Sequence, residues 1–558
     1  MAEAITEMII PGTYIEVRAE GLIGVSGIAT GNLGVVGTAS KGPVGSVQIL
    51  SAFADATATF GPPDAWAGGT NSELTLTRSL QQAFANGAST VYAVRAAAGT
   101  PAPGSRALLK GPDTVATLTA KSPGTWSGDI TVAVKPASAN AFVEPRAIPV
   151  DGGGNVGALL PNIVPSPRNA VKVTKGGTGQ TSRLALVPQP SPPGAPSTGT
   201  VVVSPTTGNL TFAPTDKPAA GDTVSATYTV AQAAARDIEI RYGNVKETYT
   251  VADALDIAID LAASTLVDVA PIAPAQASNL PDLTPTALPL AGGSNGEGAG
   301  TADYTAALAV LDAQDVNIVV LAGQSFANAS AALLAHVENA ENNGLDRIAV
   351  VGADADDVPT VQGNADSVGD DRVILVAPGI VATDLALGTP VKLPPAYSAA
   401  AVAGLIASLA VQVSPTNKEL AVSGLTTYYN DGMLKALLGS RVLPLERKSG
   451  FRVVKGITTD SGPFRQISVR RIVDYAKAGT RIGSLPYIGR LNNARVRGAM
   501  QATLNGFLSD MVLNEALTEF TVTVTATREQ EIAGLALVTM LLKPTFSIDY
   551  VKVIMNLS

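Results

Sequence analysis

The sequence predicts an α/β core domain, a mixed sheet flanked by helices, with nested β-rich inserted domains and extended strand arms at both chain ends. Three observations lead to this fold class. Helix-like and strand-like patterns alternate at 71–95 and again at 299–411. Short β-branched runs separated by Pro, Gly, Ser and Thr fill 111–290. Isolated β-branched and aromatic stretches at 8–17 and 545–558 predict a strand at each end of the chain.

The first helix–strand unit precedes the inserted part of the chain. A buried strand is expected at 33–39, and helical spacing over 71–86 ends at Asn86-Gly87 before a strand at 90–95. Within the insertion we expect a hairpin at 237–249 and a helix near 251–263. The predicted domains are an N-terminal arm (1–20), a discontinuous core (21–110 and 291–542), an inserted α+β domain (111–140 and 236–290), a nested outer β-rich domain (141–235) and a C-terminal arm (543–558).

The second half of the chain returns to alternating elements. The predicted helices are 304–313, 327–342, 397–411, 466–481 and 494–517. The predicted strands are 316–321, 346–351, 372–377, 451–459, 519–526, 533–542 and the C-terminal stretch. Because helices and strands alternate at this length, we expect a sheet with parallel members that is covered by helices on its faces.

Composition excludes several classes of site. The 558 residues are 46% hydrophobic and 15% charged, so several well-packed domains are expected. The chain has no cysteine, which excludes disulfides, thiol catalysis and Cys-ligated metals, and a single histidine, His336, excludes multi-histidine metal sites. The acidic N-terminus predicts no signal peptide. The apolar helix at 397–413 is too short to span a bilayer, so no membrane insertion is expected.

Charge is distributed unevenly along the chain. The net charge is −8, yet residues 441–500 alone carry a balance of +10, which leaves −18 for the rest. A basic region of this kind predicts an acidic partner, either nucleic acid or an acidic protein surface. Aromatic residues are only 4% of the chain and no nucleic-acid-binding motif is present, so no nucleic acid contact is expected.

The sequence contains no pattern that predicts catalysis. Gly323-Gln-Ser-Phe-Ala327 follows a strand and precedes a helix, as a nucleophile elbow does, but it lacks the last glycine. His336 follows Ser325 by eleven residues on the same predicted helix, about 16 Å along its axis, which forbids a hydrogen bond between them. We therefore expect His336 to be an ordinary residue of the helix surface.

Acidic and glycine-rich loops predict no ligand site either. Asp354, Asp356 and Asp357 lack EF-hand spacing, so a solvated turn is expected rather than a cation site. Gly292-Gly-Ser-Asn-Gly296 precedes the next helix by several residues and reads as a turn at a domain boundary. No catalytic residue, cofactor or metal is predicted.

Basic side chains on two predicted helices are the candidates for contact with an acidic partner. They are Arg470, Arg471, Lys477, Arg481, Arg495 and Arg497. Spacings of four, seven and eleven place some of those on the first helix on one side. One interpretation is a solvated face with scattered salt bridges, and the other is an electrostatic contact with an acidic surface.

The strands at the two chain ends have no hairpin partner beside them in the sequence. Their candidate contact residues are Ile9, Tyr14, Ile15, Val17, Phe546, Ile548, Tyr550, Val551 and Val553. Two terminal strands can pair within one subunit, or each can be lent to the sheet of a neighbour. Fourteen extended residues reach roughly 45 Å, enough to cross to another subunit.

A set of short strings, ordered along the chain, resembles a known family. They are Pro11-Gly-Thr-Tyr-Ile-Glu16, Gly34-Val-Val-Gly-Thr-Ala-Ser-Lys-Gly-Pro-Val-Gly45, Phe84-Ala-Asn-Gly-Ala-Ser-Thr-Val-Tyr-Ala-Val-Arg95, Ser122-Pro-Gly-Thr-Trp-Ser-Gly128, Leu290-Ala-Gly-Gly-Ser-Asn-Gly296, Leu393-Pro-Pro-Ala-Tyr397, Ser414-Pro-Thr-Asn-Lys418 and Phe464-Arg-Gln-Ile-Ser-Val-Arg-Arg-Ile-Val-Asp-Tyr475. Each string alone is weak, but their order and spacing are specific. The chain resembles the contractile tail sheath proteins of bacteriophages and, more broadly, the sheaths of pyocins and related contractile injection systems. The Pro-rich stretch 141–235 departs from the resemblance.

The resemblance implies a structural protein of the virion and no enzyme. Subunits would stack as six-membered rings around a tail tube, contract on a signal from the baseplate, and drive the tube through the host envelope during genome ejection. Terminal strands would enter the sheets of neighbours, and the basic helices would face the tube. The implied partners are other copies of the chain, the tail tube, the baseplate and the tail terminator, with assembly in the host cytoplasm. A pyocin-like or other injection system, or another virion structural protein, stays an alternative.

Overall fold

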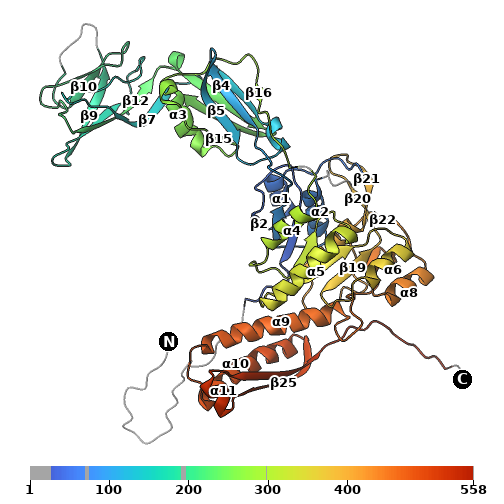
Figure 1. Cartoon of the computed structure of the whole chain (residues 1–558). Helices are drawn as coiled ribbons and strands as arrows, with labels where there is room; N and C mark the ends of the chain where they lie inside the picture. The colour runs from blue at the N-terminus through green and yellow to red at the C-terminus, as the bar shows by residue number, and fades with distance from the viewer. Residues whose placement is uncertain (1–26, 69–73, 190–195, 297, 557–558) are drawn as a thin grey trace, which may run out of the picture. The chain divides into compact units, whose positions relative to one another are not determined.

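The structure is a computed structural model. It describes residues 27–68, 74–189, 196–296 and 298–556. The N-terminal candidates Ile9, Tyr14, Ile15 and Val17 therefore lie outside the described residues. Figure 1 shows the chain coloured from its N-terminus to its C-terminus.

The chain divides into two compact units. The core unit comprises 1–39, 43–98 and 297–558, and the inserted unit comprises 40–42 and 99–296. The sequence assigned residues 99–110 and 291–296 to the core. They belong to the inserted unit because β4 (Ser105–Lys110) pairs with β5 (Asp113–Ala120) there, and the isolated bridge between Ser105 and Ala291 closes the same region.

An eight-stranded sheet organises the core unit. Its strands, in spatial order, are β2 (Val47–Leu50), β3 (Val91–Arg95), β1 (Leu33–Gly37), β17 (Ile318–Leu321), β18 (Ile348–Gly352), β19 (Val373–Ala377), β23 (Leu443–Arg447) and β24 (Phe451–Val453). The six strands from β3 to β23 run parallel, and β2 and β24 pair antiparallel at the two edges. The predicted mixed sheet with parallel members is thus confirmed.

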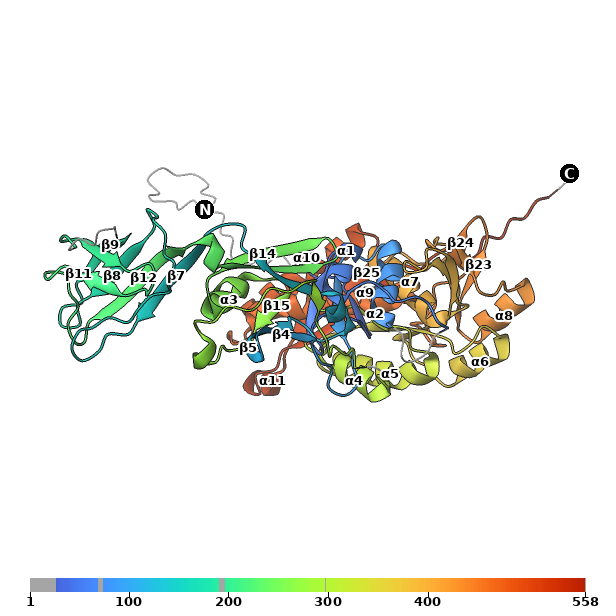
Figure 2. The same cartoon turned by 90° about the horizontal axis from the view of Figure 1, so that it is seen from above.

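Helices bury both faces of this sheet. One face carries α1 (Phe53–Phe60), α2 (Thr75–Ala85) and α7 (Pro395–Ser408), and the other carries α4 (Thr301–Ala309), α5 (Phe326–Asn342), α6 (Val358–Asp366) and α8 (Asp431–Gly439). Figure 2 looks down on this layering. Successive side chains of a strand point to opposite faces of the sheet. In β1, Val35 packs against the first group of helices and Val36 against the second. The central strands are buried on both sides, which accounts for their almost continuous apolar runs.

Helix α7 is apolar all round because it is buried all round. It packs so closely on α2 that a Cβ atom at Gly404 would lie 2.2 Å from the carbonyl oxygen of Ala83. A small antiparallel sheet of β21 (Pro390–Leu393), β20 (Ile380–Thr383) and β22 (Gly424–Leu425) lies next to it in sequence. Within the described residues, no helix is both long enough and apolar enough to cross a membrane.

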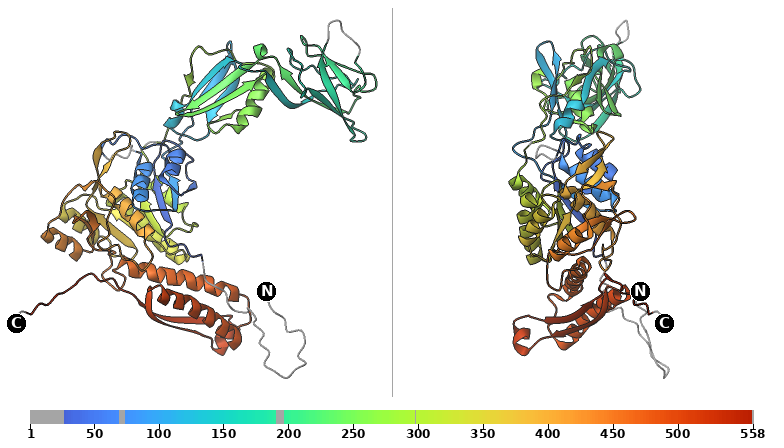
Figure 3. Two further views of the ribbon diagram at one scale, coloured as in Figure 1. Left: turned by 180° about the vertical axis from the view of Figure 1, so that it is seen from behind. Right: turned by 90° about the vertical axis from the view of Figure 1, so that its right-hand side faces the viewer.

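The core unit ends in a separate layer. It consists of α9 (Ile467–Ser484), α10 (Ala494–Leu513), β25 (Leu517–Thr525), α11 (Arg528–Ile532) and β26 (Leu537–Pro544). The two long helices pack on each other and on the β25–β26 hairpin, with Ile472, Leu504 and Leu508 fully buried between them. Figure 3 shows this orange-to-red layer from two further sides.

The inserted unit is built from three sheets and two apolar cores. Its sheets are β15-β5-β4, β14-β13-β6-β16 and β11-β10-β9-β8-β12-β7. The remaining bounds are β6 (Thr131–Pro136), β7 (Ala141–Ile148), β8 (Ala170–Thr174), β9 (Thr181–Pro188), β10 (Thr200–Val203), β11 (Leu210–Phe212), β12 (Thr223–Val230), β13 (Arg236–Tyr242), β14 (Val245–Val251), α3 (Ala254–Asp260), β15 (Val267–Val269) and β16 (Leu288–Pro289). The six-stranded sheet encloses one core and the other two sheets enclose the second.

Candidate assembly interface

The hairpin of the last layer has two open edges. One face of β25 packs on α10, where Val522 and Val524 are buried. On β26 the outward-facing Leu537 and Leu541 are exposed. In the part of the chain that the structure describes, neither strand pairs with a third. Each edge therefore presents backbone N–H and C=O groups that can template the addition of another strand.

The chain leaves β26 as an extended arm, residues 545–556. The sequence predicted that these residues form a strand, but the structure assigns no strand to them. A strand needs a ladder partner, and within the described residues the arm has none. Its large apolar side chains are exposed: Phe546 by 62%, Ile548 by 83%, Tyr550 by 80%, Val551 by 81%, Val553 by 72%, Ile554 by 71% and Met555 by 84%. A concentration of exposed apolar side chains of this kind marks an interaction surface.

The first half of the arm is nevertheless held to its own subunit. Lys455 Nζ lies 3.2 Å from Asp549 Oδ2 and donates to Tyr550 Oη at 3.1 Å, with the ammonium 4.9 Å from the centre of the Tyr550 ring. Gln466 Nε2 donates to Asp549 Oδ2 at 3.3 Å, and Ser547 Oγ donates to Asp549 Oδ1 at 3.0 Å. Burial lowers the pKa of Lys455, but these bonds to Tyr550 and Asp549 outweigh it and raise the pKa.

Sequence reasoning missed Lys455 and Gln466 as functional residues. They lie more than 80 residues before Asp549, outside any local pattern that includes the arm. The sequence contains one signal of such a contact: the polar residues Ser547 and Asp549 lie on one face of an otherwise apolar and aromatic stretch. Polar residues on one face of an extended segment indicate that this face has a polar partner.

Two of the predicted tube contacts are buried inside the fold. Arg470 and Arg471 are only 4% and 6% exposed. Arg470 Nη1 lies 2.9 Å from Asp371 Oδ2 and its Nη2 lies 2.7 Å from Asp474 Oδ1. Arg471 donates to the carbonyl oxygen of Thr30 at 3.0 Å, and burial lowers its pKa to about 10. These contacts correct the expectation that the two arginines form an exposed basic face.

Arg372, directly before β19, ties α9 to the sheet. Its side chain is 2% exposed and reaches three carboxylates: Glu341 at 2.8 Å, Asp346 at 2.9 Å and Asp474 at 3.0 Å. The guanidinium of Arg372 lowers the pKa of Glu341 most, although partial burial opposes that shift. Burial raises the pKa of Asp474, while Arg470 and Arg372 lower it. The carboxylates and cations of this cluster thus form ion pairs with each other within one subunit.

Lys477 and Arg481 extend the same cluster toward solvent. Lys477 Nζ lies 2.8 Å from Glu341 Oε1 and 2.5 Å from Asp346 Oδ1, and Arg481 Nη1 lies 2.6 Å from Asp346 Oδ2. Their side chains are 31% and 41% exposed. These two predicted tube contacts are therefore engaged in ion pairs but keep an exposed part.

The last two predicted basic contacts begin α10. Arg497 is mostly buried and pairs with Glu531 of α11 at 2.9 Å. Arg495 is exposed. Of the six basic candidates, Arg481 and Arg495 are exposed, and Arg481 is engaged in an ion pair with Asp346.

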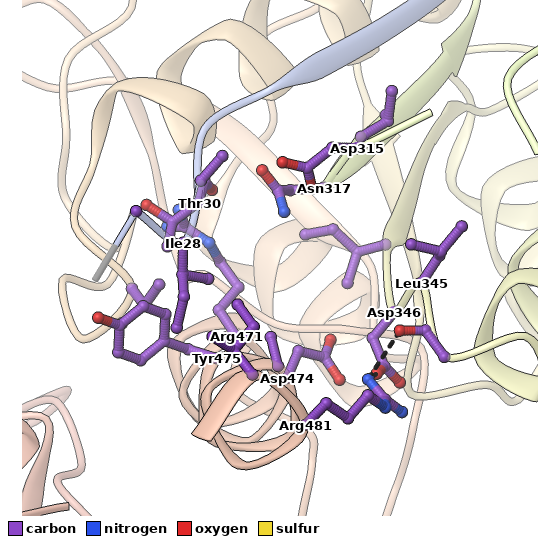
Figure 4. Close-up of a pocket in the computed structure, with 18 residues that line it drawn as sticks. Ile28, Thr30, Asp315, Asn317, Leu345, Asp346, Arg471, Asp474, Tyr475 and Arg481 are labelled. Atoms are coloured by element: carbon purple, nitrogen blue, oxygen red, sulfur yellow. Dashed lines mark hydrogen bonds and ion pairs between the residues drawn. The ribbon is translucent and has the colours of Figure 1, made fainter. Parts of the chain in front are cut away.

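A pocket of about 270 Å³ lies between α9 and the sheet. Figure 4 shows Ile28 and Tyr475 on one side of it, and the Arg481–Asp346 ion pair on the other. Arg471 and Asp474 also line it, and both are engaged by contacts within the subunit. The pocket is small for a substrate site, and four of its charged side chains, those of Asp346, Arg471, Asp474 and Arg481, are engaged within the subunit.

The acidic loop serves the fold. Asp354 accepts a hydrogen bond from the backbone N–H of Ala327 at 2.9 Å, and Asp356 accepts one from Gly379 at 2.9 Å. Asp357 caps α6 by accepting from the backbone N–H of Thr360 at 3.0 Å. Among the described residues no group of three or more His, Cys, Asp or Glu side chains could hold a metal ion.

His336 is buried, which corrects the expectation that it lies on the helix surface. It is 6% exposed, its Nδ1 lies 2.9 Å from Asp312 Oδ1, and its Nε2 lies 3.0 Å from Arg347 Nη1. Because a guanidinium can only donate, Nε2 accepts, and a neutral ring then donates from Nδ1 to Asp312. Burial and the charge of Arg347 lower the pKa of His336 to about 4, although Asp312 opposes the shift.

Neutral His336 is expected to make the subunit acid-sensitive. The unfolded histidine has a pKa near 6.5, so the unfolded chain takes up the proton first as the pH falls. The stabilisation is complete above pH 6.5 and is lost between pH 6.5 and about 4, by up to about 3 kcal/mol. Since the chain has one histidine, a single imidazole NMR signal reports the titration. A midpoint near 6.5 would contradict the burial, and H336Q, which removes the titrating group, should flatten the pH dependence of the unfolding free energy in this window.

Two family models match adjacent parts of this chain. Residues 297–459 match the phage tail sheath protein central domain, and residues 459–558 match the phage tail sheath C-terminal domain. Together they cover the part of the core unit that follows the insertion, including the hairpin and the arm. No curated protein matches the sequence significantly.

Solved structures share the fold over nearly the whole chain. A sheath tail protein from Desulfitobacterium hafniense has a TM-score of 0.56 at 16% identity, with 96% of this chain and 100% of that chain covered. A sheath tail protein from Listeria innocua has a TM-score of 0.59 at 14% identity, with 94% and 93% covered. The helical sheath of the anti-feeding prophage in its contracted state has a TM-score of 0.50 at 13% identity, with 99% of each chain covered. The resemblance read from the sequence is confirmed: residues 297–459 and 459–558 match the models of the phage tail sheath central and C-terminal domains, and solved sheath proteins share the fold.

Proposed function

We propose that this protein is the structural subunit of a contractile tail sheath. It polymerises as stacked hexameric rings around a tail tube and contracts to drive the tube through the host cell envelope during genome ejection. The observation that carries this proposal is the exposed apolar arm beside an open hairpin, in a segment that matches the sheath C-terminal domain. The subunit is a component of the virion and is assembled in the host cytoplasm.

Strand exchange links the subunits. The C-terminal arm of one subunit and the N-terminal arm of another add strands to the open hairpin edges of a third. Head-to-tail contacts of this kind do not close on themselves, so they generate open helical assemblies. The arm contact residues are those predicted at the two ends: Ile9, Tyr14, Ile15, Val17, Phe546, Ile548, Tyr550, Val551 and Val553. Burying an exposed arm of five such side chains gives on the order of 10 kcal/mol before the entropic costs of association.

Contraction requires no nucleotide. The free energy is stored in the difference between two packings of the same subunits, and the baseplate releases it. A similar sheath has been solved in a contracted state, which is one of the two packings that this mechanism requires. The tube and the tail terminator are the remaining partners, and the exposed Arg495 with the outer parts of Lys477 and Arg481 is the basic surface left to face the tube. The nested domain, 141–235, lies on the outer surface of the sheath.

A tail-like injection particle is the second candidate for the assembly that contains this subunit. The likeness to the sheath of the anti-feeding prophage favours it, because that likeness extends over 99% of both chains. Both candidates use the same subunit mechanism and differ in what the tube delivers.

Self-assembly tests the proposed function directly. Purified subunits, concentrated without any tube protein, should form long, wide, hollow tubes in the contracted arrangement, because the arm and the open hairpin are present on every copy. Negative-stain electron microscopy checks this result. Monodisperse monomers at every concentration and salt tested would contradict the proposal.

A further inference from the structure

The arm changes its apolar face at Tyr550. Up to that residue the large apolar side chains are Phe546, Ile548 and Tyr550, at every second position. Beyond it, Val551 and Val553 fall on the opposite face of an extended chain. One continuous strand in one sheet would therefore turn half of its apolar residues away from the sheet's core. This reversal indicates that the two halves of the arm do not pack in the same place.

The polar contacts of the arm converge at the same point. Asp549 has a side chain only 10% exposed, within an arm whose neighbouring side chains are mostly in solvent, and the side chain of Lys455 is 18% exposed. Gln466, at the N-terminus of α9, supplies a second donor to the same carboxylate. Exposed ion pairs contribute about 0–1 kcal/mol, but a largely desolvated pair with further hydrogen bonds contributes more. We call the four side chains Lys455, Gln466, Asp549 and Tyr550 the clasp.

The surroundings of the clasp favour the carboxylate of the arm. Lys455 and Tyr550 border a depression that is also lined by Lys435, Arg441 and Arg465. The acidic side chain in its lining is Asp460, so cations outnumber carboxylates there. An aspartate on the arm gains from this positive field, whereas a purely apolar arm would not be drawn to it.

We propose that the clasp divides the arm into an anchored root, residues 545–550, and a donated segment that begins at Val551. This inference rests on the proposed strand exchange and narrows it: Val551, Val553 and Met555 enter the neighbour's sheet, while Phe546 and Ile548 stay outside it. Lys455 is a positioning residue. By fixing the root, Lys455 raises the effective concentration of the donated segment at the neighbouring subunit. It also limits the distance that residues 551–556 can span to roughly 20 Å.

Two variants test the clasp. K455M keeps the aliphatic stem but removes the ammonium, and D549N removes the charge from the arm without touching the body of the subunit. Because the natural chain has no cysteine, N556C carries a unique fluorescent label near the end of the arm. Both variants should lower the fluorescence anisotropy of the labelled monomer and raise the lowest concentration that forms tubes about tenfold. K448M, which changes an exposed lysine outside that depression, is the matched control and should behave as the natural chain.

Anisotropy and assembly that remain unchanged in D549N would overturn the clasp. D549N changes only the arm, so it still tests the clasp if K455M fails to fold. A second pair of variants tests the division of the arm: V551S/V553S/M555S should abolish tubes and F546S/I548S should not. An equal loss in both would show that the root is also donated and would overturn the proposal. Failure of the proposed strand exchange itself would give a different result. The unmodified chain would then form no tubes, or a chain that lacks the arm would still form them.

Discussion

Removal of residues 545–558 is expected to leave a folded subunit that no longer polymerises. The described part of this segment contributes no strand and keeps its large apolar side chains in solvent, so the body of the subunit loses little when it is cut. The contacts that are lost are those of the clasp, worth about 1–3 kcal/mol at one edge of a large unit. Every copy in the assembly, in contrast, loses the strand that it lends.

The measurement pairs thermal unfolding with electron microscopy. We expect a melting temperature within a few degrees of that of the intact chain and no tubes at concentrations at which the intact chain forms them. A chain of the same length, with serine at each apolar position of the arm, separates the loss of apolar contacts from the loss of length and should also fail. Tubes formed by the truncated chain would refute strand exchange through this end.

The site of the cut matters. The sequence placed the start of the arm at Lys543, but β26 extends through Pro544, where Lys543 pairs with Glu519 and Pro544 with Leu517. A cut at Lys543 would therefore damage the hairpin that receives strands as well as remove the arm that is lent. A cut before Thr545 removes the donated segment and its root while the hairpin stays intact.

The core could be predicted because its signals are local. Val35 and Val36 fall on opposite faces of one strand, and the helices that follow each strand carry periodic apolar residues, so a sheet covered on both faces was readable from the chain. The strands β25 and β26 were predicted, at 519–526 and 533–542, for the same reason, whereas their pairing into a hairpin comes from the structure. The strand predicted for the arm is not formed within the subunit. The β-branched composition of the arm favours a strand, but composition does not reveal whether the subunit contains a second strand for it to pair with.

The charged residues could not be predicted in this way. Arg470 and Arg471 repeat on a helix as a basic face would, yet their partners are Asp371 and the carbonyl group of Thr30, about 100 and more than 400 residues away in the chain. His336 is buried through Asp312 and Arg347, which flank it on other elements. Periodicity states which side of a helix a residue occupies. Whether that side meets solvent or a distant carboxylate depends on the tertiary fold.

This burial reverses the expected result of changing the basic helix. If Arg470 and Arg471 faced a tube, glutamate at both positions would weaken docking and leave the monomer folded. In the structure, R470E would remove a cation from Asp371 and Asp474 and put a carboxylate in its place. R471E would bury a second carboxylate against the backbone carbonyl oxygens of Thr30 and Leu409. The R470E/R471E subunit is therefore expected to unfold its last layer, and this pair of changes cannot report on tube contact.

Arg372 provides the sharpest test of that cluster. R372M keeps most of the side-chain volume but leaves Glu341, Asp346 and Asp474 without their shared cation, and breaking a buried pair in this way costs about 3–5 kcal/mol. Denaturant unfolding should show this loss, and amide hydrogen exchange should show it first in α9. R481M is the matched control: its side chain is 41% exposed and it should cost less than about 1 kcal/mol. If R372M lowered the free energy of unfolding no more than R481M does, the cluster would not be what holds α9 to the sheet.

If R372M lowers the free energy of unfolding as expected, tube formation should fail although the arm is intact. The hairpin that receives a neighbour's strand packs on α9 and α10 and depends on them for its position.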